Sequence, residues 1–209
     1  MIKLHDFYRS SASFRVRIAL NLKDVPYERV AHDLDHGAHR EHSYIRVNPQ
    51  GLLPSLEIDG AVLTQSLAII EYLDARYAQL PLLPPDELGR ARVRALFQLI
   101  AADTHPITGM RLGRYLKDSL QHSDADLRRW QHHWLAESFT ALEALLTASA
   151  DTGRFSHGEH PTLADIALVP QVYSAKRQHL AFDAWPTVSK IYDTCLSLPA
   201  FKRAHPDSH

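Results

Sequence analysis

The stretch NPQGLLPSLEIDGAVLTQS, residues 48–66, decides the fold of the first part of this chain. Residues 53–58 predict a strand, the Asp-Gly pair at 59–60 predicts a tight hairpin turn, and the apolar residues after it predict the returning strand. Residues 65–77 then carry apolar side chains three and four positions apart, which predicts a helix with Ser66 as its N-cap. A hairpin followed by a helix indicates an α/β unit.

The sequence before this stretch alternates between strand and helix. Residues 2–7 and 27–30 predict strands, residues 11–22 predict a helix with one apolar face, and residues 38–47 predict a polar helix. The predicted order is therefore β-α-β-α-β-β-α. Two parallel strands joined by a helix and then a hairpin predict a small mixed sheet with helices on its faces.

Strand signals end near residue 80, where PLLPPD, residues 81–86, predicts a linker. Residues 87–120 and 124–148 predict long helices, and a shorter helix is expected over 187–197. Thr162 and Asp165 form a capping box ahead of a further helix. We therefore expect an α/β domain over residues 1–80 and an all-helical domain over residues 86–209.

Composition narrows the class of protein. The chain has 209 residues, 45% of them hydrophobic, and a formal net charge of -1, so neither a nucleic-acid partner nor an anionic membrane surface is expected. No apolar run approaches the roughly 20 residues of a membrane helix, and the N-terminus lacks signal-peptide zones. Cys195 is the single cysteine, so no internal disulfide can form. A reducing compartment, the cytoplasm, is expected.

Fourteen histidines are unusual for a chain of this length. His36, His39 and His42 follow helical spacing, and His132 adjoins His133. A metal site is one interpretation, but no carboxylate or cysteine completes a tetrahedral ligand set. A solvated helix face is therefore favoured, and no metal is expected. Unperturbed imidazoles titrate at about pH 6.5, so net charge should change between about pH 6 and 7.

The segment RSSASFR, residues 9–15, follows the first strand and opens the first helix. Unpaired N–H groups and the helix dipole stabilise an anion at such a position, and a serine hydroxyl there can donate to a thiolate. Together they can lower the pKa of a thiol from about 8.5 toward neutrality. Cys195 is distant in sequence, so the thiolate would come from a ligand. The alternative, that the serines merely cap the helix, stays open from this segment alone.

Two further features could contribute to a ligand site. If the Leu53–Pro54 bond were cis, the backbone of Leu53 would face outward and could pair with an extended peptide ligand. A proline at the start of a strand is otherwise ordinary. Gln65 and Ser66, at the start of the third helix, could hold a carboxylate.

The whole chain resembles the zeta class of glutathione transferases. RSSASFRVRIALNLKDVPYE, residues 9–28, resembles the class motif Ser-Ser-Cys-x-x-Arg-x-Arg-Ile-Ala-Leu, and further resemblance lies in NPQGLLPSL, QSLAIIEYL, THPI, PTLADIALVPQV and FKRAHP. The resemblance implies a glutathione transferase fold, with a thioredoxin-like α/β N-terminal domain and an all-α C-terminal domain. It also implies glutathione as cofactor and a homodimer that packs the first domain of one subunit against the second domain of the other.

The resemblance further implies roles for individual residues. Ser10 would orient and stabilise the glutathione thiolate, helped by Ser11. Ala12 stands where the motif has cysteine, and it should be tolerated because glutathione supplies the one thiolate that the chemistry needs. The implied glutathione-binding residues are Ser10, Ser11, Ala12, Arg15, His39, Leu53, Pro54, Gln65, Ser66 and His105.

Three arginines, Arg9, Arg111 and Arg177, resemble positions where arginines of bacterial members of the class face the substrate. Guanidinium groups bind carboxylates through two parallel hydrogen bonds, which suits a dicarboxylate. Arg9 would join Ser10 and Ser11 in catalysis. The alternative is that these arginines are ordinary surface charges.

The implied function is glutathione-dependent cis–trans isomerisation of a maleyl keto-dicarboxylate, maleylacetoacetate or maleylpyruvate, in the breakdown of aromatic compounds. The extra arginines lean slightly toward maleylpyruvate, the more charge-dense acid. An alternative is a transferase that conjugates or dehalogenates small electrophiles such as α-halo acids. A binding module without catalysis is a third possibility, against which Ser10, Gln65 and Ser66 argue.

Overall fold

A computed structural model describes residues 1–208 of the chain. By packing, the chain divides into one compact unit of residues 1–81 and 197–208 and a second unit, Leu82–Leu196. The last residues thus pack with the first unit, whereas the division expected from sequence assigned everything after residue 86 to the second domain. The reason is a helix near the C-terminus that lies against the first helix of the chain, held in part by the bond from Asn21 Nδ2 to the carbonyl of Ala200 (3.0 Å).

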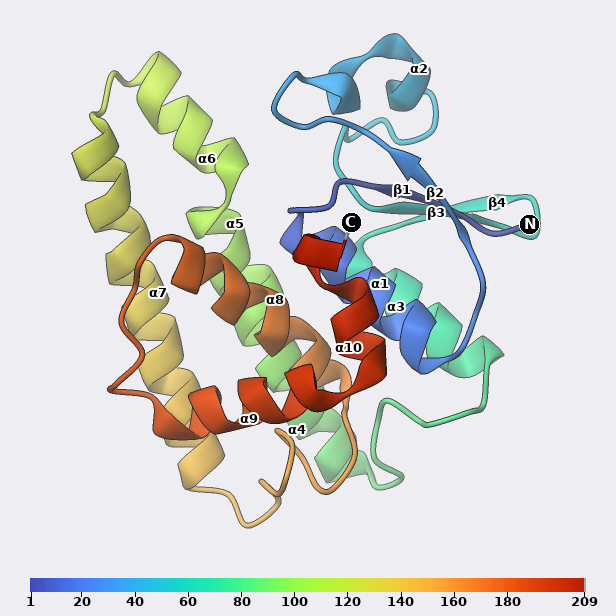
Figure 1. The fold of residues 1–209 in the computed structure, drawn as a ribbon, viewed down its shortest axis with the longest axis vertical. Helices are drawn as coiled ribbons and strands as arrows, with labels where there is room; N and C mark the ends of the chain where they lie inside the picture. The colour runs from blue at the N-terminus through green and yellow to red at the C-terminus, as the bar shows by residue number, and fades with distance from the viewer. Residues whose placement is uncertain (209) are drawn as a thin grey trace. The chain divides into compact units, whose positions relative to one another are not determined.

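The first unit is built around a four-stranded mixed sheet in the order β2-β1-β3-β4. Strands β1 and β2 are parallel, and β1–β3 and β3–β4 are antiparallel. Figure 1 shows α1 and α3 on one face of this sheet and α2 on the other side. The elements are β1 (Lys3–Asp6), α1 (Ser11–Leu22), β2 (Glu28–Ala31), the 3-10 turn η1 (Ala38–Arg40), α2 (His42–Ile45), β3 (Ser55–Ile58), β4 (Ala61–Thr64), α3 (Ser66–Arg76), α10 (Pro199–Ala204) and the 3-10 turn η4 (Pro206–Ser208).

The hairpin predicted from the Asp-Gly pair is confirmed. Asp59 and Gly60 have φ values of 51° and 81°, the left-handed conformations that a two-residue hairpin turn needs at both positions. Their turn closes the pairing of Ile58 with Ala61. The predicted order of strands and helices over the first 77 residues is confirmed as well.

Two local predictions in this unit are wrong. Gln65, not Ser66, is the N-cap of α3, and Ser66 is the first helical residue. The polar helix expected over residues 38–47 is only η1 and the four-residue α2, separated by the extended Glu41 (φ -65°, ψ 148°). His36 precedes these turns, so the three spaced histidines do not share one helix face. Among the described residues 1–208, no group of His, Cys, Asp and Glu side chains is arranged to hold a metal ion.

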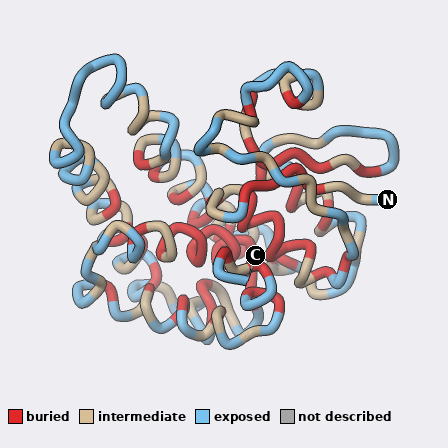
Figure 2. Tube along the Cα trace, turned by 45° about the horizontal axis from the view of Figure 1, so that its top comes forward, coloured by how far each residue is buried: buried red, intermediate tan, exposed pale blue. Residues whose placement is uncertain are grey.

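The core of the first unit lies between the sheet and the helices on its α1–α3 face. Leu4 on β1 and Leu56 on β3 are completely buried, as are Ile18 of α1 and Ile69 of α3. Figure 2 shows the buried positions gathered on the central strands and on the helix faces packed against them. This rigid layer supports the segment between β1 and α1, where the first serines lie.

The second unit is all helical, as expected. Its elements are α4 (Glu87–Gln98), the π-helical turn η2 (Leu99–Thr104), α5 (His105–Thr108), α6 (Met110–Arg114), the π-helical turn η3 (Tyr115–Ser119), α7 (Asp124–Thr147), α8 (Leu163–Arg177) and α9 (Pro186–Ser197), the last residue of which is grouped with the first unit. Among residues 1–208, no helix combines the length and the apolar character needed to cross a membrane.

The helix predicted over residues 87–120 is interrupted. Pro106 lacks the N–H that a continuing helix would use, and Gly109 is extended (φ -78°, ψ 163°) between α5 and α6. The capping box before α8 is confirmed, because Asp165 accepts from the backbone N–H of Thr162 at 2.7 Å. Asp165 is fully buried, and burial raises the pKa of its carboxyl group.

Candidate active site

The start of α1 presents a serine hydroxyl at a helix N-terminus. Ser10 is the N-cap, with extended backbone (φ -67°, ψ 117°), and its Oγ accepts the N–H of Ser13 at 3.2 Å. Accepting through a lone pair leaves the hydroxyl hydrogen available for donation. Ser11 is the first helical residue, and the first turn of α1 contains no acidic residue. An anion near Ser10 would therefore meet a hydroxyl donor and the positive end of the helix dipole.

A buried guanidinium connects α1 with the start of α3. Arg15 is 1% exposed, and its Nη1 donates to Oγ of Ser66 at 3.4 Å. Burial lowers the pKa of Arg15 to about 10, so the side chain stays charged at neutral pH. Ser66 is also buried, in the first turn of α3. The start of α3 thus combines a helix N-terminus with a positive charge beneath it, which favours a carboxylate.

The residue before α3 has an unusual backbone. Gln65 has φ 67° and ψ 119°, a region that costs a residue with a side chain on the order of 1–3 kcal/mol. Such conformations persist where surrounding contacts impose them, often at ligand sites. Gln65 Nε2 donates to Oε1 of Gln50 at 2.9 Å, which ties the start of α3 to the loop before β3.

That loop carries the Leu53–Pro54 bond, which is cis. Pairing of β3 with β1 begins at Ser55, so the backbone N–H and C=O of Leu53 lie outside the sheet ladder. The neighbouring carbonyl of Leu52 accepts from the Tyr44 hydroxyl at 2.7 Å, which fixes the loop in place. A peptide-like ligand could therefore pair with the Leu53 backbone as a short added strand.

His39 lies beside the same loop. It is 8% exposed, within η1. Gly51 has φ 58°, and a Cβ built there would come within 3.0 Å of the carbonyl oxygen of His39, so this close approach needs glycine. The first unit thus gathers most of the expected glutathione-binding residues on α1, η1, the loop before β3 and the start of α3: Ser10, Ser11, Ala12, Arg15, His39, Leu53, Pro54, Gln65 and Ser66.

Arg9, next to the cap, is held by contacts that sequence reasoning missed. Its guanidinium lies over the rings of Phe7 (5.3 Å) and Tyr8 (5.2 Å), and its Nη2 donates to the carboxylate of Asp35. The Arg9 side chain remains 30% exposed. Asp35 lies in the irregular segment after β2, where no periodic pattern gives its position.

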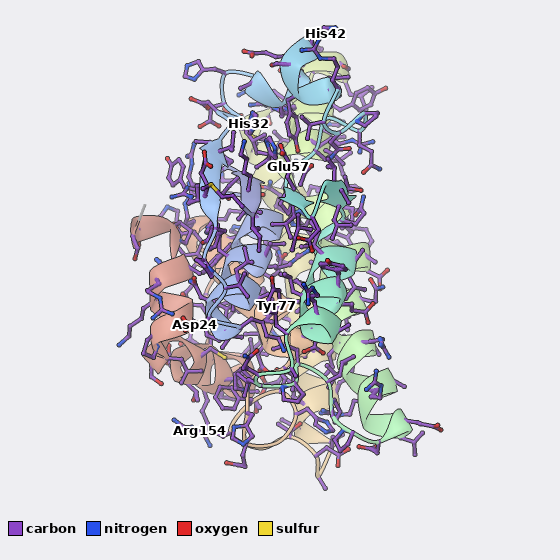
Figure 3. All side chains as sticks on the ribbon, turned by 90° about the vertical axis from the view of Figure 1, so that its right-hand side faces the viewer. Asp24, His32, His42, Glu57, Tyr77 and Arg154 are labelled. Carbon is purple, nitrogen blue, oxygen red and sulfur yellow. The ribbon has the colours of Figure 1, made fainter. Side chains whose placement is uncertain are left out.

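A chain of titratable side chains under α2 was also missed. His5 Nε2 lies 2.7 Å from Oε1 of Glu57, and His5 Nδ1 lies 2.8 Å from Nε2 of His32. Figure 3 shows His32 and Glu57 together on the α2 side of the sheet. Burial, then the neighbouring His5, lowers the pKa of His32. The parallel register of β1 with β2 and the antiparallel register of β1 with β3, both unknown from sequence, bring these residues together.

The other expected residues lie in the second unit. His105 begins α5, just after the π-helical turn η2, and is half-buried. Arg111 is exposed on α6. Arg177 is exposed in the last turn of α8, with its guanidinium 5.9 Å from the centre of the Tyr173 ring.

One turn of α7 anchors the two segments that carry these arginines. Trp130 Nε1 donates to the carbonyl of Ile107 in α5 at 2.7 Å, just before α6 begins. Two residues further along α7, His132 Nε2 lies 2.8 Å from the carbonyl of Gln178, which follows Arg177. The α6 end and the α8 end are therefore both tied to the same part of α7.

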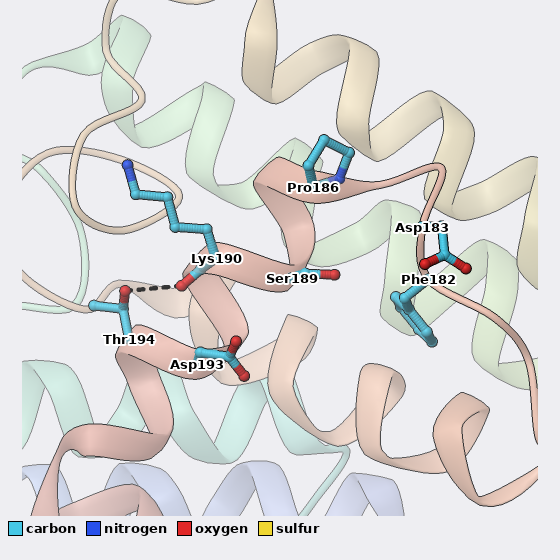
Figure 4. Close-up of a pocket in the computed structure, with 7 residues that line it drawn as sticks. All are labelled: Phe182, Asp183, Pro186, Ser189, Lys190, Asp193 and Thr194. Carbon is cyan, nitrogen blue, oxygen red and sulfur yellow. Dashed lines mark hydrogen bonds between the residues drawn. The ribbon is translucent and has the colours of Figure 1, made fainter.

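A hollow along the start of α9 is unrelated to the expected residues. Figure 4 shows its lining, and Thr194 there bonds to the carbonyl of Lys190 one turn earlier (2.8 Å). The lining residues are Phe182, Asp183, Pro186, Ser189, Lys190, Asp193 and Thr194. The hollow contains no expected site residue, so we do not take it as the active site.

Comparison with known proteins assigns the fold to a class. Residues 4–81 match the family model "Glutathione S-transferase, N-terminal domain", and residues 121–193 match "Glutathione S-transferase, C-terminal domain". The chain is 42% identical over 208 residues to maleylacetoacetate isomerase of Pseudomonas aeruginosa, an alignment that covers 98% of this chain and 96% of that protein.

Two solved structures refine the assignment. A holo maleylpyruvate isomerase, described as a bacterial glutathione S-transferase of the zeta class, has a TM-score of 0.97 and 43% identity, covering 99% of this chain and 98% of that one. Maleylacetoacetate isomerase of Methylobacterium extorquens AM1, solved with malonate and glutathione, has a TM-score of 0.96 and 38% identity, covering 99% and 97%. The chain belongs to the glutathione S-transferase family, in its zeta class.

Proposed function

We propose that this chain is a glutathione-dependent cis–trans isomerase that converts a maleyl keto-dicarboxylate, maleylacetoacetate or maleylpyruvate, to its fumaryl isomer in the breakdown of aromatic compounds. The observation that carries the proposal is the N-cap of α1, where Ser10 offers a hydroxyl donor at the N-terminus of a helix whose first turn contains no acidic residue. Similarity to isomerases over the full chain supports it.

The residues of the first unit fit glutathione. A γ-glutamyl carboxylate matches the start of α3, where Ser66 and the buried charge of Arg15 meet. Gln65, whose backbone is strained, is the N-cap of the same helix. The backbone of Leu53 is suited to the peptide part, and His39 to the glycyl end. We propose that Ser11, Ala12, Pro54 and His105 complete this set.

Glutathione, when bound, supplies the thiolate that adds reversibly to the cis double bond, so that rotation and departure give the trans product and free glutathione. The chain's own part is to hold that sulfur ionised and aligned. The Ser10 hydroxyl and the N–H groups of α1 stabilise negative charge at the sulfur, and Ser11 assists from the first helical position.

We assign substrate binding to Arg9, Arg111 and Arg177. Each guanidinium can hold a carboxylate through two hydrogen bonds, and a doubly charged substrate needs more than one such group. A positive group near the keto oxygen also stabilises the negative charge that builds there, an effect worth roughly 3 kcal/mol for one donor. Three arginines suit maleylpyruvate slightly better, because its charges are closer together.

Two broader properties complete the proposal. We infer a homodimer, as the family resemblance implies, and a cytoplasmic location. The second inference agrees with the single cysteine, since a chain with one cysteine forms no internal disulfide. Cys195 is buried, and burial raises the pKa of its thiol. Because this raised pKa keeps the Cys195 thiol protonated, glutathione remains the source of the reactive thiolate.

The test is an absorbance assay of maleylacetoacetate and maleylpyruvate, each with and without glutathione, while free thiol is followed in parallel. We expect conversion to the fumaryl product only when glutathione is present, with free thiol constant throughout. Thiol loss that matches product formation would instead identify a conjugating transferase. No conversion of either substrate would reject the isomerase.

A further inference from the structure

Arg17, in the second turn of α1, carries a buried charge for which the proposed reaction has no use. Its side chain is 0% exposed. Burial lowers the pKa of its guanidinium, while the Asp6 carboxylate raises it. A buried charge is retained only where charged and polar partners surround it, so its partners show what it holds.

The partners of Arg17 lie on both sides of the guanidinium. Nη1 donates to Oδ1 of Asp6 at 2.5 Å and to the carbonyl of Phe7 at 3.4 Å. Nη2 donates to the carbonyl of Tyr8 at 2.8 Å, and Nε donates to the carbonyl of Ala204 at 3.0 Å. One side chain therefore bonds the end of β1, the two residues after it and the last residue of α10.

Two of these carbonyls belong to the turn that delivers Ser10. The Phe7 carbonyl also accepts the backbone N–H of Ser10 at 2.9 Å, closing a turn over residues 7–10. Arg17 thus holds two consecutive peptide groups of a four-residue turn whose last member is the N-cap of α1. Misplacement of a catalytic group by about 1 Å can cost about a hundredfold in rate, so the geometry of this turn matters for catalysis.

The contact with Ala204 brings the C-terminal helix into the same network. The last carbonyls of a helix lack partners within it, and Arg17 satisfies one of those of α10. Asn21 makes a second bond from α1 to α10, to the carbonyl of Ala200, but does not touch the turn. Loss of the Asn21 bond should therefore loosen α10 alone, whereas loss of the Arg17 bonds should loosen both α10 and the turn over residues 7–10.

We propose that Arg17 is a positioning residue for the thiolate: its guanidinium ties α10 and the Asp6 carboxylate to the turn over residues 7–10 and thereby fixes the Ser10 hydroxyl at the start of α1. This inference rests on the proposed glutathione-dependent function. Arg17 acts through the turn, and its buried position keeps it away from substrate.

Arg17→Lys and Asn21→Ala test this inference as a matched pair in the full-length protein. Lysine keeps the positive charge, but its single ammonium cannot span acceptors on both sides as the guanidinium fork does. Three quantities are measured for each variant with glutathione bound: the thiol pKa from thiolate ultraviolet absorbance against pH, kcat with the KM for glutathione, and amide hydrogen exchange over residues 199–204.

We expect both variants to exchange faster over residues 199–204, because each loses one bond to α10. Only Arg17→Lys should raise the bound thiol pKa, by about one unit, and lower kcat about tenfold, with the KM for glutathione within about threefold of the parent. Asn21→Ala should keep the parent's thiol pKa and kcat.

An Arg17→Lys protein with the parent's thiol pKa and kcat would overturn the inference. An equal rise of the thiol pKa in Asn21→Ala would overturn it too, since docking of α10 alone would then suffice. If Arg17→Lys does not fold, Arg17→Gln is measured in its place, because Asp6 keeps its bond from Arg29 (2.8 Å). A parent protein whose bound glutathione has an unshifted thiol pKa would reject the proposed function itself, and this inference with it.

Discussion

Arg15 and Arg17 of the first unit differ from Arg111 and Arg177 of the second in how they meet water. The first two are 1% and 0% exposed and donate hydrogen bonds inside the protein, to Ser66 and to the turn before α1. Arg111 and Arg177 are exposed. Both pairs are arginines on helices, yet only the buried pair was desolvated and oriented during folding.

We propose that this difference gives the two pairs of arginines different roles. Groups fixed before the ligand arrives need no reorganisation at the moment of reaction, so they suit a cofactor that is always the same. Exposed guanidinium groups stay hydrated and adjustable until a carboxylate replaces the water. Variants of the buried pair should therefore change kcat, thiol ionisation or glutathione binding. Variants of Arg111 and Arg177 should change the KM for substrate.

The largest expected effect comes from Ser10→Ala, which removes the preset donor. We expect kcat to fall by on the order of a hundredfold, as for the loss of one oxyanion donor, with little change in the KM for substrate. Steady-state kinetics at saturating glutathione measure it. Ser13→Ala is the matched control, because the Ser13 hydroxyl is buried without a hydrogen-bond partner in the described structure. Unchanged kcat in Ser10→Ala would exclude Ser10 from thiolate activation.

Arg15→Met should have the next largest effect. Methionine fills part of the buried space but removes the charge beneath Ser66 at the start of α3. We expect the KM for glutathione to rise about tenfold to a hundredfold, with kcat at saturating glutathione reduced far less, as measured by varying glutathione at fixed substrate. If kcat fell and the KM for glutathione did not change, Arg15 would serve the thiolate instead of the carboxylate.

Arg177→Ala probes the exposed side of the comparison. We expect the KM for the dicarboxylate to rise about tenfold, while the KM for glutathione and the melting temperature stay at the parent values, because an exposed charge adds little to stability. Arg154→Ala is a close control: Arg154 is also exposed in the second unit, 5.7 Å from the centre of an aromatic ring. Equal KM values for Arg177→Ala and the parent would remove Arg177 from the substrate site.

The smallest expected effect concerns the histidines under α2. The pKa of His32 is lowered by burial and by His5, so folding favours its neutral form; His39 also lowers it, and Glu41 and Asp6 partly offset the shift. Below about pH 6.5 the unfolded chain can protonate His32 more readily than the folded protein can. The free energy of unfolding is therefore unaffected by His32 above about pH 6.5 and decreases as the pH falls below it.

We expect the melting temperature to drop by a few degrees more between about pH 7.5 and 5.5 in the parent than in His32→Gln. Circular dichroism melts at each pH measure it. His122→Gln, at an exposed histidine of the second unit, should keep the parent's pH dependence. A parallel drop in His32→Gln and the parent would rule out His32 as the source.

The same contrast explains which features could be predicted from sequence. Local chemistry was sufficient for the Asp59-Gly60 turn, for serines at the start of α1 and for the Thr162–Asp165 box, because each depends on neighbours within a few residues. All three are features of the local backbone, and residue types close together in the sequence determine them.

Features that depend on packing could not be predicted in this way. The contacts of Arg15 with Ser66, of Arg9 with Asp35 and of Arg17 with α10 join residues 26 to 187 positions apart. A charged residue in an amphipathic helix ordinarily lies on the solvent-exposed face, so the sequence pattern does not predict that Arg15 and Arg17 are buried.

The most direct test of the central claim is a crystal structure of this protein with glutathione. Our account predicts the sulfur within hydrogen-bond distance of Ser10 Oγ, about 3.0–3.5 Å, with the γ-glutamyl carboxylate at Ser66. A sulfur turned away from Ser10, or glutathione bound elsewhere, would contradict the account.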